Sequence, residues 1–420
     1  MTKADKEGQR KAPILRFKGF TDDWEQRKLG EIGKTYSGLS GKNKSDFEKG
    51  NSNFVTFLEV LNNPVLKNID LTNKVEIKEN EHQNKVKRND ILFNTSSETP
   101  EEVATSTVVD VNQNNLYLNS FCFGFRPNVQ FSNYYIGYYL RSNHFRSRVF
   151  CLAQGISRYN ISKKSLIKLK LSLPKLEEQD KISRIFNQIE LLLTLYERKL
   201  KLLSQVKKYF LDNLFTEKEY PNLRFKGFTD AWEQRKLGQV GKTQSGVGFP
   251  NEEQGGLEGI PFFKVSDMNN PGNEYEMVNA NNYVKDDQLA RKKWHPIKSV
   301  PAVIFAKVGA AIMLNRKRLV TRPFLIDNNS MAYIFDDSWD INFGKNIFET
   351  INLPRYAQVG ALPSYNGSDI QGIKIFLPRK NEQSKIGIFI MTINEIITLY
   401  ENKQQHLTKI KKTLLNTMFI

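Results

Sequence analysis

Two stretches of the sequence place apolar residues alternately three and four positions apart. The first runs from Ile182 to Asn213 and the second from Ile386 to Thr417, and eight of the ten positions in each series are apolar or Tyr. A seven-residue repeat sustained in this way is typical of a long helix that packs against another long helix. Residues 177–215 contain no Gly or Pro, and the second stretch contains only Gly387. We therefore predict two long helices that pair with each other, antiparallel.

The other apolar runs are short and are bounded by Asn, Gly, Pro and Asp, as β-strands that end in turns are. Six runs have strand composition: Asn53–Val60, Asp90–Asn94, Ser120–Arg126, Pro261–Ser266, Ala302–Lys307 and Met331–Phe335. A further helix is predicted over Ser132–Arg148. Besides its long helices, the chain is thus expected to have globular parts of mixed α/β class.

The sequence contains an internal repeat, which indicates two half-length units. Leu15–Gly38 and Leu223–Gly246 are identical at 20 of 24 positions, and Leu173–Ile182 resembles Leu377–Ile386 at an offset of 204. A Tyr-Asn pair precedes each second block, as Tyr159-Asn160 and Tyr365-Asn366. About 130 residues between the paired blocks diverge. Copied segments suit a scaffold or two copies of one partner, and divergent segments suit two different ligands.

The charge of the chain points to a polyanionic partner. Its 420 residues include 62 Lys and Arg against 45 Asp and Glu, which gives a net charge of +17. Two segments contain no acid, residues 111–176 with ten basic residues and residues 288–326 with nine. Both lie largely in the divergent parts, where they match the electrostatic footprint of a phosphate backbone.

Several classes of protein are excluded by composition. The chain has no apolar run of membrane-spanning length, and its first residues lack the apolar core of a signal peptide. Two cysteines in 420 residues do not form a disulfide framework. We expect a cytoplasmic protein with no membrane partner.

The sequence lacks the motifs of the common nucleic-acid enzymes. Gly33-Lys34-Thr35 and Gly241-Lys242-Thr243 suggest phosphate loops, but the Gly expected five residues earlier is Lys28 or Lys236. The four histidines are scattered without metal-ligand spacing. We therefore expect neither a catalytic residue nor a metal site in this chain.

Two other interpretations stay open on the residues alone. Asp70, Glu76 and Lys78 loosely resemble the carboxylate set of a metal-dependent nuclease, so a stand-alone nuclease is one alternative. The other is a bivalent nucleic-acid-binding scaffold that bridges its partners.

A known family combines these features. The duplicated motif at Trp24–Gly30 and Trp232–Gly238, the Tyr-Asn pairs, the two Leu-Pro blocks and the heptad helices together resemble the specificity subunit of type I restriction-modification systems. The resemblance covers the chain from about residue 15 onward.

The resemblance implies a division of labour. Each variable segment would be a target recognition domain that reads one half of a bipartite, asymmetric site in double-stranded DNA. The conserved helices would set the spacing between half-sites and dock two methyltransferase subunits, and through them the restriction/translocase subunits. The chain would not be an enzyme by itself. Adenine-N6 methylation and ATP-dependent endonuclease activity, with S-adenosylmethionine, ATP and Mg²⁺, would belong to the partners, with the target base flipped out of the duplex.

The resemblance also implies boundaries and contact residues. The expected parts are a basic flexible tail over 1–14, recognition domains over 15–172 and 219–376, and helical spacers over 173–218 and 377–420. The expected DNA contacts are Lys42, Lys44, Asn94, Ser96, Ser97, Arg158, Tyr159 and Asn160 in the first half, and Lys264, Lys307, Arg316, Arg318, Tyr365 and Asn366 in the second. The expected contacts with partner subunits are Trp24, Arg27, Trp232 and Arg235.

Overall fold

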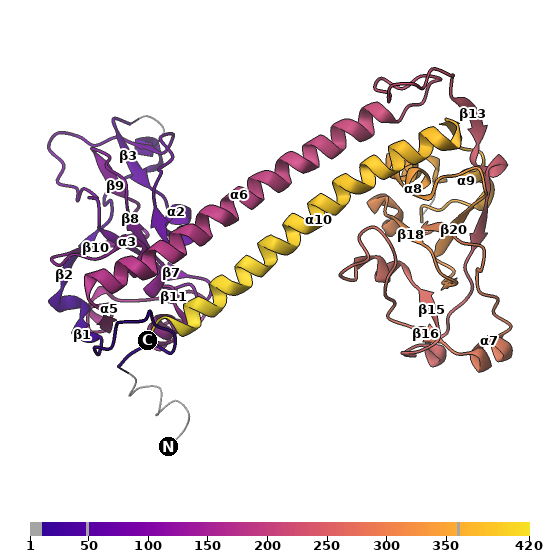
Figure 1. Ribbon diagram of the computed structural model, residues 1–420. Helices are drawn as coiled ribbons and strands as arrows, with labels where there is room; N and C mark the ends of the chain where they lie inside the picture. Colours follow the sequence, from indigo (N-terminus) through magenta and orange to yellow (C-terminus); the bar gives the residue numbers. More distant parts are fainter. Residues whose placement is uncertain (1–10, 48–49, 359–361) are drawn as a thin grey trace. The chain divides into compact units, whose positions relative to one another are not determined.

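The computed structural model describes residues 11–47, 50–358 and 362–420, which form two compact units (Figure 1). Unit 1 comprises the chain up to Glu197 together with Asn402–Ile420, and unit 2 comprises Arg198–Glu401. Most of the expected basic tail, residues 1–10, lies outside the described residues. The recognition-domain and spacer boundaries stay predictions.

The two long helices are present and begin and end close to their predicted limits. Helix α6 spans Leu176–Leu214 and helix α10 spans Lys380–Thr417, and each passes from one unit into the other. Their contacts run antiparallel within each unit. In unit 1 Glu190 pairs with Lys411, and Phe186 meets Phe419, which follows the end of α10. In unit 2 Lys199 lies over the Tyr400 ring and Phe210 packs on Phe389. The predicted class, mixed α/β with paired antiparallel helices and an internal repeat, is confirmed.

Unit 1 is built around a five-stranded sheet of order β2-β10-β6-β8-β4 and a three-stranded sheet of order β5-β3-β9. Its strands are β1 (Glu25–Lys28), β2 (Gly33–Ser37), β3 (Ser52–Val55), β4 (Val65–Leu66), β5 (Lys74–Val75), β6 (Ile91–Asn94), β7 (Ser96–Ser97), β8 (Ser106–Val109), β9 (Leu116–Leu118), β10 (Cys122–Pro127), β11 (Tyr159–Asn160) and β12 (Lys170–Leu173). Its shorter helices are α2 (Phe57–Asn62), α3 (Asn133–Tyr139), α4 (Asn143–Phe150) and α5 (Lys163–Leu166), with 3-10 turns η1 (Leu29–Glu31) and η2 (Lys44–Phe47).

Unit 2 repeats this plan with a four-stranded sheet of order β14-β20-β17-β18 and a three-stranded sheet of order β16-β15-β19. Its strands are β13 (Glu233–Lys236), β14 (Gly241–Ser245), β15 (Ile260–Phe263), β16 (Tyr283–Val284), β17 (Ala302–Ala306), β18 (Lys317–Val320), β19 (Leu325–Ile326), β20 (Ser330–Phe335) and β21 (Lys374–Leu377). Its shorter helices are α7 (Asp286–Lys292), α8 (Ile341–Thr350) and α9 (Gly367–Gln371), with 3-10 turns η3 (Leu237–Gln239), η4 (Asn251–Glu253), η5 (Val265–Asn269), η6 (Ala310–Leu314) and η7 (Leu353–Tyr356).

The divergent segments therefore share one topology although their sequences do not align. In both units the large sheet is antiparallel through its central strands, and the small sheet joins one antiparallel and one parallel pair. Strands predicted at 90–94, 120–126, 302–307 and 331–335 correspond to β6, β10, β17 and β20. The run 53–60 was expected to be one strand, but β3 ends at Val55 and α2 begins at Phe57. The predicted helix over 132–148 is divided into α3 and α4.

The copied blocks build the same buried ion pair in each unit. Arg16 donates from Nε and Nη2 to the two carboxylate oxygens of Glu178 at 2.7 and 2.8 Å, and Arg224 does the same to Glu382 at 2.7 and 2.8 Å. Both carboxylates are almost fully buried. These bidentate pairs fasten the segment before β1 or β13 to the first turn of α6 or α10.

The single glycine in the second heptad stretch has a packing reason. A Cβ on Gly387 would lie 2.6 Å from Asp340 Oδ1 and 2.9 Å from the backbone nitrogen of Phe343. Asp340 caps α8 by accepting from that same nitrogen at 3.0 Å. Gly387 thus lets α10 approach the capped end of α8. At the equivalent position of unit 1, Ser183 uses its hydroxyl to accept from the Tyr135 backbone nitrogen at 2.8 Å.

Candidate nucleic-acid interface

In unit 1, a short antiparallel ribbon joins two of the segments expected to contact DNA. Ser96–Ser97 (β7) pairs with Tyr159–Asn160 (β11). Gln154 and Asn160 exchange two backbone hydrogen bonds of 2.9 and 2.8 Å, which close the loop between them. Ile161 then donates its backbone N–H to the Thr95 carbonyl at 3.0 Å, and Ser162 caps helix α5. The structure therefore brings Ser96, Ser97, Tyr159 and Asn160 together.

Unit 2 has the corresponding arrangement. Gln358 donates to the Ser364 carbonyl at 2.8 Å, and Val308 pairs with Ser364. Tyr365 donates its backbone N–H to the Lys307 carbonyl at 3.2 Å, and Asn366 caps helix α9. Lys307, Tyr365 and Asn366 are thus neighbours, as expected from the sequence.

These contacts show that the two Tyr-Asn pairs are not equivalent positions. The bonds to Thr95 and Lys307 match Tyr365 with Ile161, and the two helix caps match Asn366 with Ser162. Tyr365 is buried and donates its hydroxyl to the Ala306 carbonyl at 2.6 Å, so it takes the core position of Ile161. The repeated dipeptide therefore occupies different positions in the two units. Tyr365 belongs to the core of unit 2, whereas Asn366 is exposed and its contact with DNA stays a prediction.

Several of the expected contact residues in unit 1 are occupied within the protein. Asn94 is completely buried, and its amide donates to the Glu102 carbonyl at 2.9 Å. Ser96 is also buried, and the hydroxyl of buried Ser97 donates to the Glu102 carboxylate at 2.6 Å. The Lys42 side chain is only 3% exposed because its ammonium pairs with Glu81.

The accessible expected residues of unit 1 are Lys44, Arg158, Tyr159 and Asn160, of which Tyr159 is half-buried and the others are exposed. Arg158 and Asn160 lie on the loop that Gln154 closes. The buried residues therefore shape this surface, and the accessible ones can reach a ligand.

In unit 2 the expected basic residues lie around the end of β17 and on β18. Lys307 follows β17, and Arg316 and Arg318 flank the start of β18. Arg316 contacts the Asn269 side chain, and Arg318 donates to the Met268 carbonyl at 3.3 Å. Lys264 lies on another segment, where its ammonium donates to Gln254 at 3.2 Å. These four cations are half-buried.

The loop that follows the equivalent strand differs in chemistry between the units. We call residues 95–105 the strand-end loop of unit 1 and residues 307–316 the strand-end loop of unit 2. The first exposes Glu98, Glu101 and Glu102, whereas the second contains no acid and exposes Met313 and Leu314. Sequence reasoning missed all five residues. A search of the loop after each predicted strand for exposed non-basic side chains could have found them.

The residues expected to bind partner subunits divide into a buried and an accessible set. Trp24 and Trp232 are 3% and 2% exposed and pack edge-on against Tyr135 and Phe343. Their indoles therefore belong to the cores of the units and present no surface to a partner. Arg27 and Arg235 lie on β1 and β13, where each contacts the Glu two residues before it, and both stay accessible.

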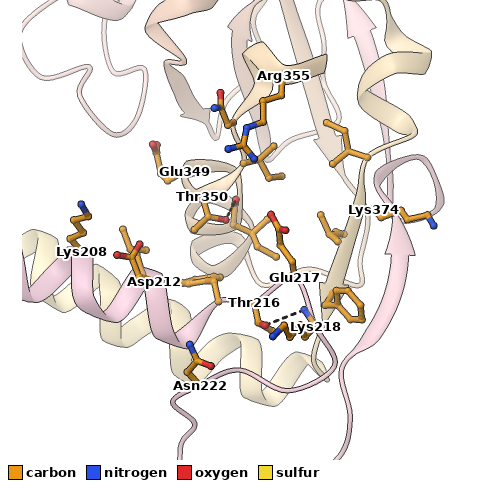
Figure 2. Close-up of a pocket in the computed structure, with 18 of the residues that line it drawn as sticks. Lys208, Asp212, Thr216, Glu217, Lys218, Asn222, Glu349, Thr350, Arg355 and Lys374 are labelled. Carbon is orange, nitrogen blue, oxygen red and sulfur yellow. Dashed lines mark hydrogen bonds between the residues drawn. The ribbon is translucent and has the colours of Figure 1, made fainter. Parts of the chain in front are cut away.

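A cleft of about 1250 Å³ opens in unit 2 beside the end of α6 (Figure 2). Charged residues that line it are Lys208 and Asp212 on α6, Arg355 on η7 and Lys374 on β21. Its apolar lining residues include Leu211, Phe215, Ile347, Ile351, Ile373 and Phe376. Apolar and charged side chains occur together in protein-binding surfaces.

Two lysines are buried close to this cleft. The Lys317 ammonium donates to the Ile351 carbonyl at 2.8 Å, and burial lowers its pKa to about 8. Lys345 pairs with Glu349, and burial together with the nearby cations Arg318 and Lys317 holds its pKa well below its usual value. Burial therefore disfavours the charged form of both lysines.

Chemistry outside the interface is limited. Within residues 11–47, 50–358 and 362–420, no three His, Cys, Asp or Glu side chains gather as metal ligands would. Asp70 accepts from the backbone and hydroxyl of Thr72 at 2.9 and 2.6 Å, which lowers the pKa of its carboxyl. Nor does any helix in the described part of the chain have the length and apolarity needed to span a membrane.

Comparisons with known proteins agree with this architecture. A family model described as the type I restriction modification DNA specificity domain matches residues 21–205 and again residues 229–409. The type I restriction enzyme MjaVIII specificity subunit of Methanocaldococcus jannaschii is 22% identical over 421 aligned positions, covering 94% of this chain and 92% of that protein.

Two solved structures share the fold. The S subunit of a type I restriction-modification system from M. genitalium matches with a TM-score of 0.59 at 14% identity, over 97% of this chain and 99% of that one. A chain from a study of complex assembly and conformational transition of the type I R-M system matches with a TM-score of 0.52 at 15% identity, over 96% and 98% of the two chains.

Proposed function

Because the chain belongs to the type I restriction-modification DNA specificity family, and is a specificity subunit that is not catalytic by itself, we propose how its two units divide the work. Each unit reads one half of a bipartite, asymmetric site in duplex DNA. The alternative of a stand-alone nuclease is not supported by this membership.

The observation that supports the proposal is that the two units share one fold but expose chemically different side chains on equivalent loops. Both units hold the strand-end loop against the segment before α5 or α9 with matching backbone hydrogen bonds. The exposed side chains on the loops include three carboxylates in unit 1, and in unit 2 they are apolar residues flanked in sequence by cations. Side chains that differ at equivalent places select different bases. The two half-sites should therefore differ in sequence.

The proposal assigns individual residues to DNA. In unit 1 the accessible Lys44, Arg158, Tyr159 and Asn160 contact the duplex, while the buried Asn94, Ser96 and Ser97 hold the surface in shape. In unit 2 the contacts are Lys264, Lys307, Arg316 and Arg318, whose charges bind phosphates. Most of these contacts position the DNA, and a minority specify bases.

The copied scaffold supports two docking sites for one kind of partner. We place the methyltransferase subunits on the surfaces that carry Arg27 and Arg235, and in unit 2 on the cleft beside α6 as well. The restriction subunits join through the methyltransferases. Methyl transfer to adenine N6, with S-adenosylmethionine, and cleavage, with ATP and Mg²⁺, take place in those partners.

Mapping methylated adenines genome-wide, with the chain co-expressed with its methyltransferase, tests the proposal. Replacing residues 39–160 with the segment of a relative should change one half-site and leave the other intact. A change in both half-sites, or methylation that does not depend on the chain, would contradict it. The purified chain with Mg²⁺ and duplex DNA should bind without cutting.

The long helices provide a second test. Since α6 and α10 each pass from one unit into the other, we propose that their length sets the spacer between half-sites. Inserting four residues, about one helical turn, at matched positions of both helices should change the spacer in the methylation map. An unchanged spacer in a folded, doubly lengthened variant would refute this role.

A further inference from the structure

Two neighbouring apolar side chains project from the strand-end loop of unit 2. Met313 and Leu314, the last residues of η6, are 66% and 57% exposed. Single exposed apolar residues are common on protein surfaces, but adjacent ones held in a fixed turn need a reason. Ile312, directly before them, is 1% exposed and anchors the turn in the core of unit 2.

The loop is held in place at both of its ends. Gly309 begins the turn with φ of +81° and donates to the Pro363 carbonyl at 2.9 Å. Asn315 ends it with φ of +50°, accepts from the Leu353 backbone nitrogen at 3.1 Å and donates to the Ile351 carbonyl at 3.4 Å. Met313 and Leu314 are therefore presented to solvent by a preorganised support, which lowers the entropic cost of binding.

The charges that flank the pair along the sequence favour one kind of ligand. Lys307 precedes the turn and Arg316 and Arg318 follow it, within the 39-residue stretch 288–326 that contains no acid. The strand-end loop of unit 1, in the equivalent place, exposes three glutamates instead. An apolar pair between cations matches duplex DNA, because the cations meet phosphates while the pair meets an apolar group on a base edge.

Duplex DNA offers one apolar group of that kind. In the major groove the thymine C5-methyl is the apolar group among hydrogen-bond donors and acceptors. We propose that Met313 and Leu314 of unit 2 contact thymine methyl groups in one half-site, an inference that rests on the proposed function. Unit 1, with carboxylates in the equivalent loop, does not make this contact.

Uracil provides the test, since it pairs as thymine does but lacks the methyl. The complex of the chain with its methyltransferase is titrated with duplexes of the mapped site, in which thymines of either half-site are replaced by uracil. Replacement in one half-site should weaken binding about fourfold to fifteenfold, the range expected for one or two buried methyl groups. The M313S/L314S variant should bind the thymine and uracil duplexes equally, and the conservative M313L/L314M variant should regain the difference.

The possible failures can be told apart. A complex that binds no site-specific DNA refutes the proposed function as well. A complex that binds normally but ignores uracil, or a mapped site with no thymine in either half, overturns the methyl contact alone. If M313S/L314S loses the methyltransferase on co-purification while still discriminating uracil, the pair is a protein contact and the inference is wrong. Thermal unfolding of both variants should match the parent, because the side chains are exposed.

Discussion

Phe419 connects the end of the chain to the core of unit 1, and its replacement by Ala should weaken that unit specifically. The side chain is 3% exposed, and its ring lies 5.6 Å from Tyr135, 5.9 Å from Tyr139 and 5.6 Å from Phe186. Tyr135 and Tyr139 belong to α3, and Phe186 to α6. One substitution therefore removes a ring that joins two elements of the unit.

The expected loss is large relative to the stability of a domain. Truncating a buried Phe to Ala costs about 3–5 kcal/mol, with the upper part of the range reached where the cavity cannot collapse. Here three aromatic neighbours line the cavity, so we expect about 4 kcal/mol. A domain is stable by only about 5–15 kcal/mol. F419A should thus leave unit 1 folded but prone to opening.

Hydrogen exchange with mass spectrometry can localise this loss. Peptides from α3 should lose protection in F419A, while peptides from α8 in unit 2 should not. The matched control is F215A, because Phe215 is 6% exposed and stacks on Phe343 of α8 at 5.2 Å. F215A should reverse the pattern. Unchanged protection of α3 in F419A, or equal loss in α3 and α8, would refute the assignment of the chain's last residues to unit 1.

Three further substitutions follow from buried polar groups. Burial lowers the pKa of Lys317 to about 8, below its value in the unfolded chain. K317M should therefore raise the free energy of unfolding by about 2 kcal/mol at pH 7, as measured by urea titration. The parent protein should gain stability as the pH rises from about 8 to about 10, whereas the variant should not. E178Q and E382Q should each lower the free energy of unfolding by about 3 kcal/mol, and the two losses should be similar because the two ion pairs have the same geometry. Thermal unfolding that differs widely between the two variants would contradict this equivalence. W232F should destabilise more than W24F by about 1 kcal/mol in chemical denaturation, because the Trp232 indole donates to Glu382 at 3.4 Å whereas Trp24 Nε1 is buried without a partner.

The long helices and the repeat could be predicted from the sequence because their signals are local and sustained. The heptad pattern lies wholly within α6, and the stretch 177–215, which contains no Gly or Pro, matches α6 to within one residue at each end. Near α2 the local signal was available but was outweighed by the apolar run 53–60. Thr56 accepts from the Glu59 backbone nitrogen while Glu59 accepts from the Thr56 backbone nitrogen, a capping box that stops β3 and starts the helix. Ser142 likewise caps α4, and this cap divides the segment 132–148 that was expected to be one helix.

The candidate site was harder to predict because burial decides which polar side chains are accessible. Asn94, Ser96 and Ser97 have the residue types of DNA contacts, but Asn94 is the last residue of the buried strand β6, and Ser96 and Ser97 form the buried strand β7. The Tyr-Asn pairs were misleading because the identity of two residues does not report their hydrogen-bond register. A shift of two residues changes the register of a strand, although each side chain stays on the same face. The membership of Phe419 in unit 1 is a contact between distant parts of the sequence, and no local pattern reports it.

The division of unit 1 between the two ends of the chain has a consequence for biosynthesis. Unit 2 is continuous from Arg198 to Glu401, whereas unit 1 lacks Asn402–Ile420 until all of unit 2 has been translated. Domains usually fold in the order in which they leave the ribosome. Here the unit that emerges first is completed last, and the apolar surface around Tyr135 remains exposed in the nascent chain until then. A chaperone that binds exposed aromatic surface should therefore meet this protein at its N-terminal unit, for as long as the second unit takes to be made.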